Sequence, residues 1–119
     1  MKLKQSGTGS GGAFAWLFQR ITGLILVIVL LLHYLFLHFL NDGGVTYREV
    51  AGRLAAPFWK SVDLLFLLSV VYHAVQGIIM NIHDYIHRPG FRVTLAGLTW
   101  LLGIVLLITG ATTIISFQP

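Results

Sequence analysis

Three long apolar stretches dominate the pattern of hydrophobic and polar positions along the chain. They cover residues 21–40, 62–82 and 93–115, and most polar residues lie outside them. Each stretch has close to the roughly 20 residues that a helix needs to cross a hydrocarbon layer of about 30 Å. A secretory signal peptide would have an apolar stretch of only about 7–15 residues and then a small-residue cleavage site, which the first stretch does not show. The pattern therefore predicts an all-α membrane protein with three transmembrane helices.

The connections between these stretches predict the organisation of the chain. The first residues are rich in glycine, serine and threonine without periodicity, which is typical of a flexible tail. The short second connection contains Pro89-Gly90 and makes the second and third helices antiparallel neighbours. The predicted segments, in chain order, are a tail at 1–14, a span at 15–40, a loop at 41–58 with a short interfacial helix at 47–54, a span at 59–83, a loop at 84–92, a span at 93–116 and a tail at 117–119.

The distribution of lysine and arginine predicts the orientation in the membrane. The eight basic residues divide five to three between the two sides: Lys2, Lys4, Arg20, Arg88 and Arg92 on the side of the amino terminus, and Arg48, Arg53 and Lys60 on the other. Because the more basic side faces the cytoplasm, the amino terminus is predicted inside and the carboxyl terminus outside. The formal net charge of +4 fits anchoring at anionic lipid headgroups better than binding to nucleic acid.

Composition supports this assignment and excludes some chemistry. The chain has 119 residues, of which 56% are hydrophobic and 10% charged, and its mean hydropathy is +0.83. It has no cysteine, so it supplies no disulfide, thiolate nucleophile or cysteine ligand for an iron–sulfur cluster. A chain of three spans without a sizeable domain outside the membrane is expected to work within a larger complex. Ala96, Gly103 and Gly110, spaced by seven residues, predict a face for close contact with another helix.

One histidine stands out, because an ionisable side chain inside a membrane span is costly and indicates function. His73 lies in the apolar part of the second span, and its helical face continues with Gly77, Met80, Asn81 and Asp84. A neutral imidazole beside a small residue suits a haem iron, since nitrogen ligates the metal and glycine leaves room for the flat macrocycle. A hydrogen bond to a neighbouring helix is the alternative that spacing alone leaves open.

Other polar residues in or near the spans have simpler interpretations. His33, deep in the first span, is interpreted as an interhelical hydrogen-bonding or packing residue, with ligation of a second haem as the alternative. His38 is expected to reach the membrane interface, and His83 and His87 to lie among the headgroups. Asp63 is expected in the first turn of the second span, where a carboxylate complements the helix dipole, with proton carrying as the alternative.

A second group of polar residues lies where the spans meet the inner interface. Asp84 and Tyr85 end the second apolar segment and Arg20 opens the first, so the three are expected at a similar depth. A tyrosine hydroxyl can donate to a quinone carbonyl, an arginine can stabilise negative charge on a reduced quinone or a haem propionate, and Asp84 can hold the arginine or relay protons. An ordinary interfacial belt of tyrosine, arginine and histidine is the alternative.

Two blocks of the sequence resemble a known family. The first is FQRITG, followed by a long apolar run that contains His33. The second is PFWKSVDLLFLLSVVYHAVQGIIMNIHDYIHRP, with the pattern histidine, three residues, glycine, six residues, aspartate-tyrosine. Together they resemble the hydrophobic membrane-anchor subunits of succinate dehydrogenase and fumarate reductase, respiratory complex II, and most closely the D-type anchor. The resemblance covers about residues 16–116.

This resemblance implies a protein of the bacterial cytoplasmic membrane that pairs with a second three-helix membrane anchor, the C-type anchor of the same family. Electrons would arrive through a flavoprotein and an iron–sulfur subunit, so the chain would not be catalytic alone. The competing functions are a proton-relaying small subunit of a membrane transporter and a structural anchor without a cofactor.

The resemblance also implies roles for particular residues. A haem b would lie between the two anchors, with His73 as one axial ligand and Gly77 beside it. Arg20 would lie near the haem propionates and the quinone pocket. Tyr85 would hydrogen-bond the quinone and Asp84 would be its neighbour in the pocket, whether the quinone is ubiquinone or menaquinone.

Overall fold

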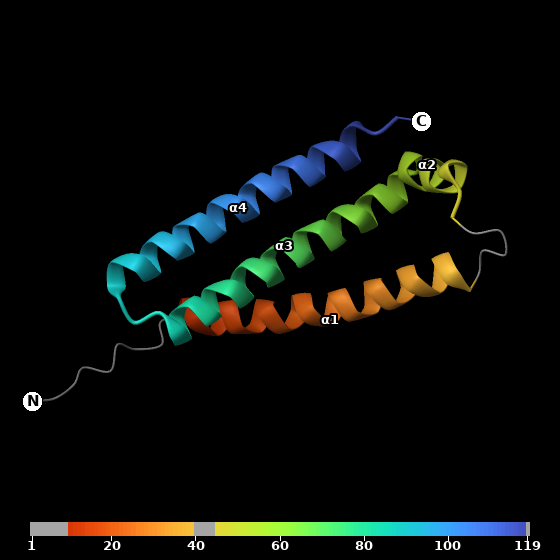
Figure 1. Ribbon diagram of the computed structural model, residues 1–119. Coiled ribbons are helices and arrows are strands. Elements are labelled where there is room, and N and C mark those ends of the chain that lie inside the picture. Colours follow the sequence, from red (N-terminus) through yellow and green to blue (C-terminus); the bar gives the residue numbers. More distant parts are fainter. Residues whose placement is uncertain (1–9, 40–44, 119) are drawn as a thin grey trace, which may run out of the picture.

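The chain is helical throughout most of the part that the computed structural model describes, residues 10–39 and 45–118. Helices with membrane-spanning character are present at Gly12–Leu35, Pro57–Tyr85 and Pro89–Ser116, where the hydropathy is 2.2, 1.8 and 2.1. The prediction of an all-α protein with three spans is therefore confirmed. In chain order the helices are α1 at Ser10–His38, α2 at Tyr47–Ala55, α3 at Pro57–Tyr85 and α4 at Pro89–Ser116 (Figure 1).

The helices extend beyond several of the predicted boundaries. α1 begins at Ser10, inside the predicted tail, and α3 continues through Tyr85. Both α3 and α4 begin with a proline, Pro57 and Pro89, which is tolerated because the first N–H of a helix has no partner within the helix. An apolar run marks the part of a helix that lies in hydrocarbon, and the helix itself continues into the interface. Residues 1–9 of the predicted tail and the predicted end of the first span at residue 40 lie outside the described residues.

A capping box fixes the start of α2, which lies in the segment where the sequence predicts a short interfacial helix. The hydroxyl of Thr46 accepts a hydrogen bond from the backbone N–H of Glu49 at 3.4 Å, and the Glu49 carboxylate accepts one from the N–H of Thr46 at 3.0 Å. These two bonds satisfy N–H groups that have no partner inside the helix. α2 then packs against α3, and Ala51 of α2 is buried.

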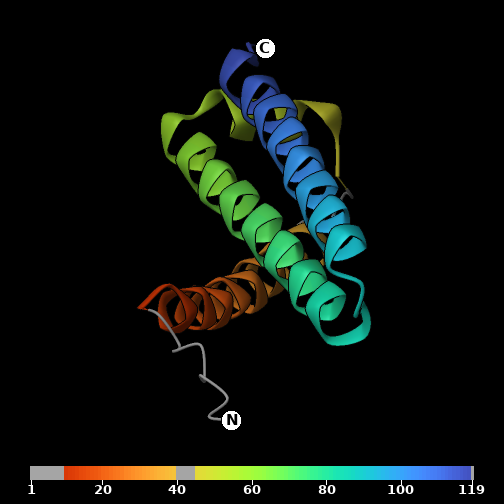
Figure 2. The ribbon, with the colours of Figure 1, turned by 90° about the vertical axis from the view of Figure 1, so that its left-hand side faces the viewer.

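α3 is the central helix of the structure, and α1, α2 and α4 each pack against it. α4 runs alongside α3, whereas α1 crosses α3 obliquely on another side (Figures 1 and 2). The start of α1 and the α3–α4 connection lie at one end of the bundle, which we call the N-terminal end. α2 and the end of α4 lie at the other, the α2 end.

Glycines allow α4 to approach α3 closely. A Cβ atom at Gly103 would lie 2.5 Å from Cγ2 of Val75, and one at Gly110 would lie 2.8 Å from Cδ2 of Leu67. Both distances are too short for real Cβ contacts, so two members of the predicted small-residue face do pack against a neighbouring helix. A Cβ at Gly97, also on α4, would meet no atom within 4 Å.

Gly103→Ala is expected to destabilise the packing of α4 on α3 by about 1–3 kcal/mol, the usual cost of overpacking. Val75 is β-branched and cannot easily rotate out of the way within a helix. Gly97→Ala is the matched control, because its methyl group meets nothing. The thermal unfolding midpoint in detergent should fall for Gly103→Ala and stay unchanged or rise slightly for Gly97→Ala. Equal midpoints for the two variants would contradict this account of the packing.

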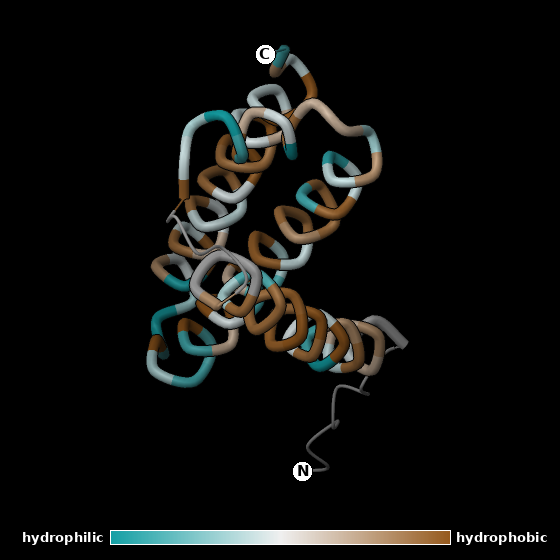
Figure 3. The backbone as a smooth tube through the Cα atoms, turned by 90° about the vertical axis from the view of Figure 1, so that its right-hand side faces the viewer, coloured by the Kyte–Doolittle hydropathy of each residue, from teal (hydrophilic) through white to brown (hydrophobic). Residues whose placement is uncertain are grey.

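The three long helices expose mostly apolar surface. In Figure 3 the hydrophobic colour follows the helices, and hydrophilic segments gather mainly near their ends. Among the described residues the only buried hydrophobic side chains are Ala51 and Val75. Hydroxyls on the spans bond to carbonyls of their own helix, as Thr99 does to the carbonyl of Leu95 at 2.8 Å, so they need no water. Such a surface suits lipid tails and other membrane helices, and the chain has little core of its own.

Candidate functional site

An open groove with a volume of about 510 Å³ lies beside His73, where α1 meets α3. Most of its lining is apolar, with one imidazole and one guanidinium group. The lining residues are Trp16, Gln19, Arg20, Gly23, Leu24 and Val27 of α1, and His73 and Met80 of α3.

The imidazole of His73 is held against α1 by a hydrogen bond. Its Nδ1 lies 3.2 Å from the backbone carbonyl oxygen of Gln19 and 3.4 Å from the hydroxyl oxygen of Thr22. A carbonyl oxygen only accepts, so Nδ1 carries the proton and donates, and Nε2 keeps its lone pair. The interhelical hydrogen bond that the sequence left open is therefore present, and it leaves the second ring nitrogen free to bind a metal. Metal-ligating histidines commonly donate their other N–H in this way.

Gln19 also joins the two helices through its side chain. Its Nε2 donates to the backbone carbonyl of His73 at 3.2 Å. Gly77 lies beside this amide, and a Cβ at Gly77 would be in ordinary van der Waals contact with that Nε2, at 3.5 Å. The Oε1 of Gln19 is buried and has no hydrogen-bond partner in the described part of the chain. A hydrogen-bond donor to this oxygen would have to come from outside the described part of the chain.

The small residue beside the imidazole is Gly23, which sequence reasoning gave no role. A Cβ there would lie 3.1 Å from Cε1 and 3.5 Å from Nδ1 of His73. Gln19, Thr22 and Gly23 are spaced by three and four residues, so they share one face of α1. That spacing is the signal in the sequence that marks them as a set.

Arg20 lies in the same groove as His73. Its guanidinium carbon is 4.4 Å from the centroid of the Trp16 ring, a cation–π contact that holds the charge over an aromatic face. Both residues line the groove. The structure therefore brings together Arg20 and His73, which are 53 positions apart in the sequence.

Asp84 and Tyr85 lie in the last turn of α3, at the N-terminal end of the bundle, and do not line this groove. Both are exposed, Tyr85 to 76%. His83 and His87 beside them are exposed as well. These four residues are exposed polar side chains near the N-terminal end of the bundle, and none of them lines the groove.

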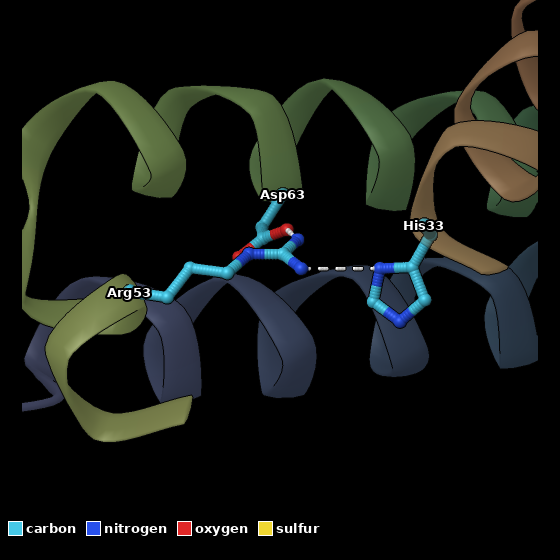
Figure 4. Close-up of polar contacts among 3 residues, drawn as sticks. All are labelled: His33, Arg53 and Asp63. Carbon is cyan, nitrogen blue, oxygen red and sulfur yellow. Dashed lines mark hydrogen bonds and ion pairs between the residues drawn. The ribbon is translucent and has the colours of Figure 1, made fainter. Parts of the chain in front are cut away.

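A second polar cluster joins α1, α2 and α3 toward the α2 end (Figure 4). The Arg53 guanidinium lies between two partners: Nη2 donates to the Asp63 carboxylate at 2.7 Å, and Nη1 is 3.2 Å from Nδ1 of His33. The arginine and aspartate side chains are only 24% and 20% exposed. Because a guanidinium only donates, Nδ1 of His33 is an acceptor and Nε2 carries the proton. His33 and His73 are thus opposite tautomers.

The structure corrects the expectation for Asp63. α3 begins at Pro57, so Asp63 lies beyond the first turn, and that turn contains no acidic residue. The interpretation as a partner of the helix dipole is therefore wrong, and the carboxylate instead neutralises Arg53 across two helices. α1 ends at His38, whose side chain lies outside the described part of the structure.

No group of three or more histidine, cysteine, aspartate or glutamate side chains could hold a metal ion in the described residues. A metal bound by this part of the chain would therefore take at most two of these side chains as ligands. The groove with His73 suits an ion that brings most of its other ligands with it.

Comparison with known proteins gives consistent results. Residues 4–111 match the family described as succinate dehydrogenase/fumarate reductase transmembrane subunit. A succinate dehydrogenase hydrophobic membrane anchor subunit from Archaeoglobus fulgidus is 33% identical over 91 residues, which cover 74% of this chain and 78% of that protein. A protein of the same description from Rickettsia conorii is 32% identical over 110 residues, covering 91% of this chain and 85% of that protein. The matching residues include those of the groove beside His73 and the cluster of His33, Arg53 and Asp63.

Proposed function

The chain belongs to the succinate dehydrogenase/fumarate reductase transmembrane subunit family, and from this we propose that it anchors a succinate:quinone oxidoreductase in the membrane. It shares a haem b with a second membrane anchor and forms part of the quinone site. Electrons come from a flavoprotein through an iron–sulfur subunit, and the chain is not an enzyme by itself. The small apolar core and the exposed apolar surface of the spans support a place in a larger bundle.

His73 is the residue that would bind the haem iron. The observation that carries this proposal is the bond from Nδ1–H to the Gln19 carbonyl, which leaves the Nε2 lone pair for the iron. The apolar wall made by Leu24 and Val27 suits a macrocycle, and Arg20 provides a cation for its propionates. When bound, the haem would act as a one-electron carrier between the two anchors.

Arg20, Asp84 and Tyr85 are the proposed contribution of this chain to the quinone pocket. The Tyr85 hydroxyl would donate a hydrogen bond to a quinone carbonyl, and Arg20 would stabilise negative charge on the ring oxygen. Asp84 would orient the arginine or hold a proton for transfer. The exposure of Asp84 and Tyr85 at the end of α3 supports a pocket that other subunits complete, with ubiquinone or menaquinone as the substrate.

We place the chain in the bacterial cytoplasmic membrane with its amino terminus in the cytoplasm and its carboxyl terminus outside. The five-to-three division of basic residues supports this orientation. The N-terminal end of the bundle, with Arg20 and Tyr85, would then face the iron–sulfur subunit.

Purification of the complex through a tag on this chain tests the proposal. The flavoprotein and iron–sulfur subunits are expected to co-purify, and the reduced-minus-oxidised absorption spectrum is expected to show b-type haem bands. Co-purification without those bands would favour a structural anchor without a cofactor. Ion flux through vesicles that contain this chain alone would favour the transporter alternative.

His33→Gln is expected to leave the haem content per chain unchanged. Nδ1 of His33 accepts from Arg53, and a glutamine oxygen can take over that hydrogen bond. In the unmodified chain, Nε2 of His33 carries a proton and so does not offer a lone pair to iron. Haem content is measured by the absorption of the reduced haem against the amount of chain. Loss of about half of the haem would instead support the alternative of a second haem ligated by His33.

A further inference from the structure

The hydroxyl of Thr22 faces the imidazole of His73 from a buried position. Thr22 is only 8% exposed. Its hydroxyl donates to the carbonyl of Phe18 at 2.7 Å and also lies 3.2 Å from the carbonyl of Gln19, so its hydrogen is used within α1. The oxygen lone pairs therefore remain for the proton on Nδ1 of His73, 3.4 Å away.

The proton on Nδ1 thus lies between two acceptors on α1, the Gln19 carbonyl and the Thr22 hydroxyl. Hydrogen-bond acceptors at this proton raise the electron density of the imidazole and make it a better donor to a metal. A better donor favours the more highly charged, oxidised iron over the reduced one, and so lowers the reduction potential.

Gly23 keeps the imidazole in this position. A Cβ at Gly23 would lie 3.1 Å from Cε1 of His73, so the ring packs directly against the backbone of α1. The ring therefore lies between the helices with its Nδ1 edge toward Gln19 and Thr22.

We propose that Thr22 is a positioning residue that lowers the reduction potential of haem b by accepting a hydrogen bond from His73. This inference rests on the proposed ligation of the haem by His73. It adds a residue that does not line the groove and would act through His73.

Thr22→Val in the intact complex tests the inference, because valine has nearly the same shape and lacks the hydroxyl. The midpoint potential of the haem is expected to become more positive, with up to about a tenfold change in the ratio of oxidised to reduced haem at a fixed ambient potential. For a one-electron couple, tenfold corresponds to about 59 mV. Thr22→Ser keeps the hydroxyl and is expected to retain the potential of the unmodified complex. The EPR spectrum of the ferric haem should change in the valine variant and not in the serine variant.

An unchanged or more negative potential in Thr22→Val would overturn the inference, as would an equal shift in Thr22→Ser. If the valine variant fails to assemble, Thr22→Ala provides a second variant without the hydroxyl and must show the same positive shift. Absence of haem from the unmodified complex would reject the proposed function itself. If the unmodified complex contains haem and Thr22→Val leaves its midpoint potential unchanged, only the role of Thr22 would be rejected.

Discussion

Replacement of His73 by alanine is expected to lower the haem b content of the assembled complex by at least about tenfold. Loss of a residue that merely supports a metal ligand commonly costs about 10–100-fold in affinity, and this change would remove the ligand itself. Two observations support the proposed ligation: Nδ1 of His73 donates to the Gln19 carbonyl, so that Nε2 is the nitrogen with the lone pair, and His73 lines an open groove. The measurement is the reduced-minus-oxidised absorption of the haem, normalised to the amount of this chain in the purified complex.

Two controls separate ligation from a general loss of structure. His83→Ala removes an exposed histidine from the same helix and is expected to keep the full haem content. His73→Gly with added imidazole is expected to regain part of the haem, because the free imidazole can occupy the space that the side chain leaves. A normal haem content in His73→Ala would rule out the assignment of the ligand.

Substitution at the proposed quinone pocket is expected to slow quinone reduction and to leave the earlier steps intact. A hydrogen bond to a charged group contributes about 1.5–3 kcal/mol and a neutral one about 0.5–1.5 kcal/mol. At about 1.36 kcal/mol per factor of ten, Arg20→Ala should lower kcat/KM for quinone by about 10–100-fold and Tyr85→Phe by about 2–10-fold. The measurement is succinate-dependent reduction of a water-soluble quinone by the purified complex.

The chain offers matched controls at the α2 end. Tyr47→Phe removes the hydroxyl of a tyrosine that is 79% exposed, close to the 76% of Tyr85. Arg48→Ala removes an exposed cation from the same helix. Both are expected to keep quinone reduction unchanged. Electron transfer from succinate to a soluble dye that bypasses the anchor should be normal in every variant. Unchanged quinone reduction in both Arg20→Ala and Tyr85→Phe would exclude the pocket.

The number and positions of the spans were predictable because a membrane leaves the backbone few choices. A segment in hydrocarbon must satisfy its own N–H and C=O groups, so a long apolar run has to be a helix. The helix ends were less predictable, since caps and prolines in the interface set them. The expectation for Asp63 failed because α3 starts at Pro57, which places Asp63 beyond the first turn.

The candidate site was predictable only in part. His73 and Arg20 stand out in the sequence because charged or ionisable groups are rare in a span. The main partner of His73 is a backbone carbonyl, that of Gln19, which has no signature in the sequence. The tautomer of His33 depends on Arg53, which lies on another helix, so the depth of His33 in its own span was not enough to assign its role.

Two polar contacts hold α1 against its neighbours. Gln19 contacts His73 nearer the N-terminal end, and His33 contacts Arg53 toward the α2 end. A helix that slips by one residue moves about 1.5 Å along its axis and turns by about 100°. The first contact alone fixes one point of α1, and the second fixes its rotation and its depth at another. An insertion or deletion of one residue between these two points would put them out of phase, so that α1 keeps one contact and loses the other. The length of this segment is therefore as constrained as the identity of the residues at its two ends.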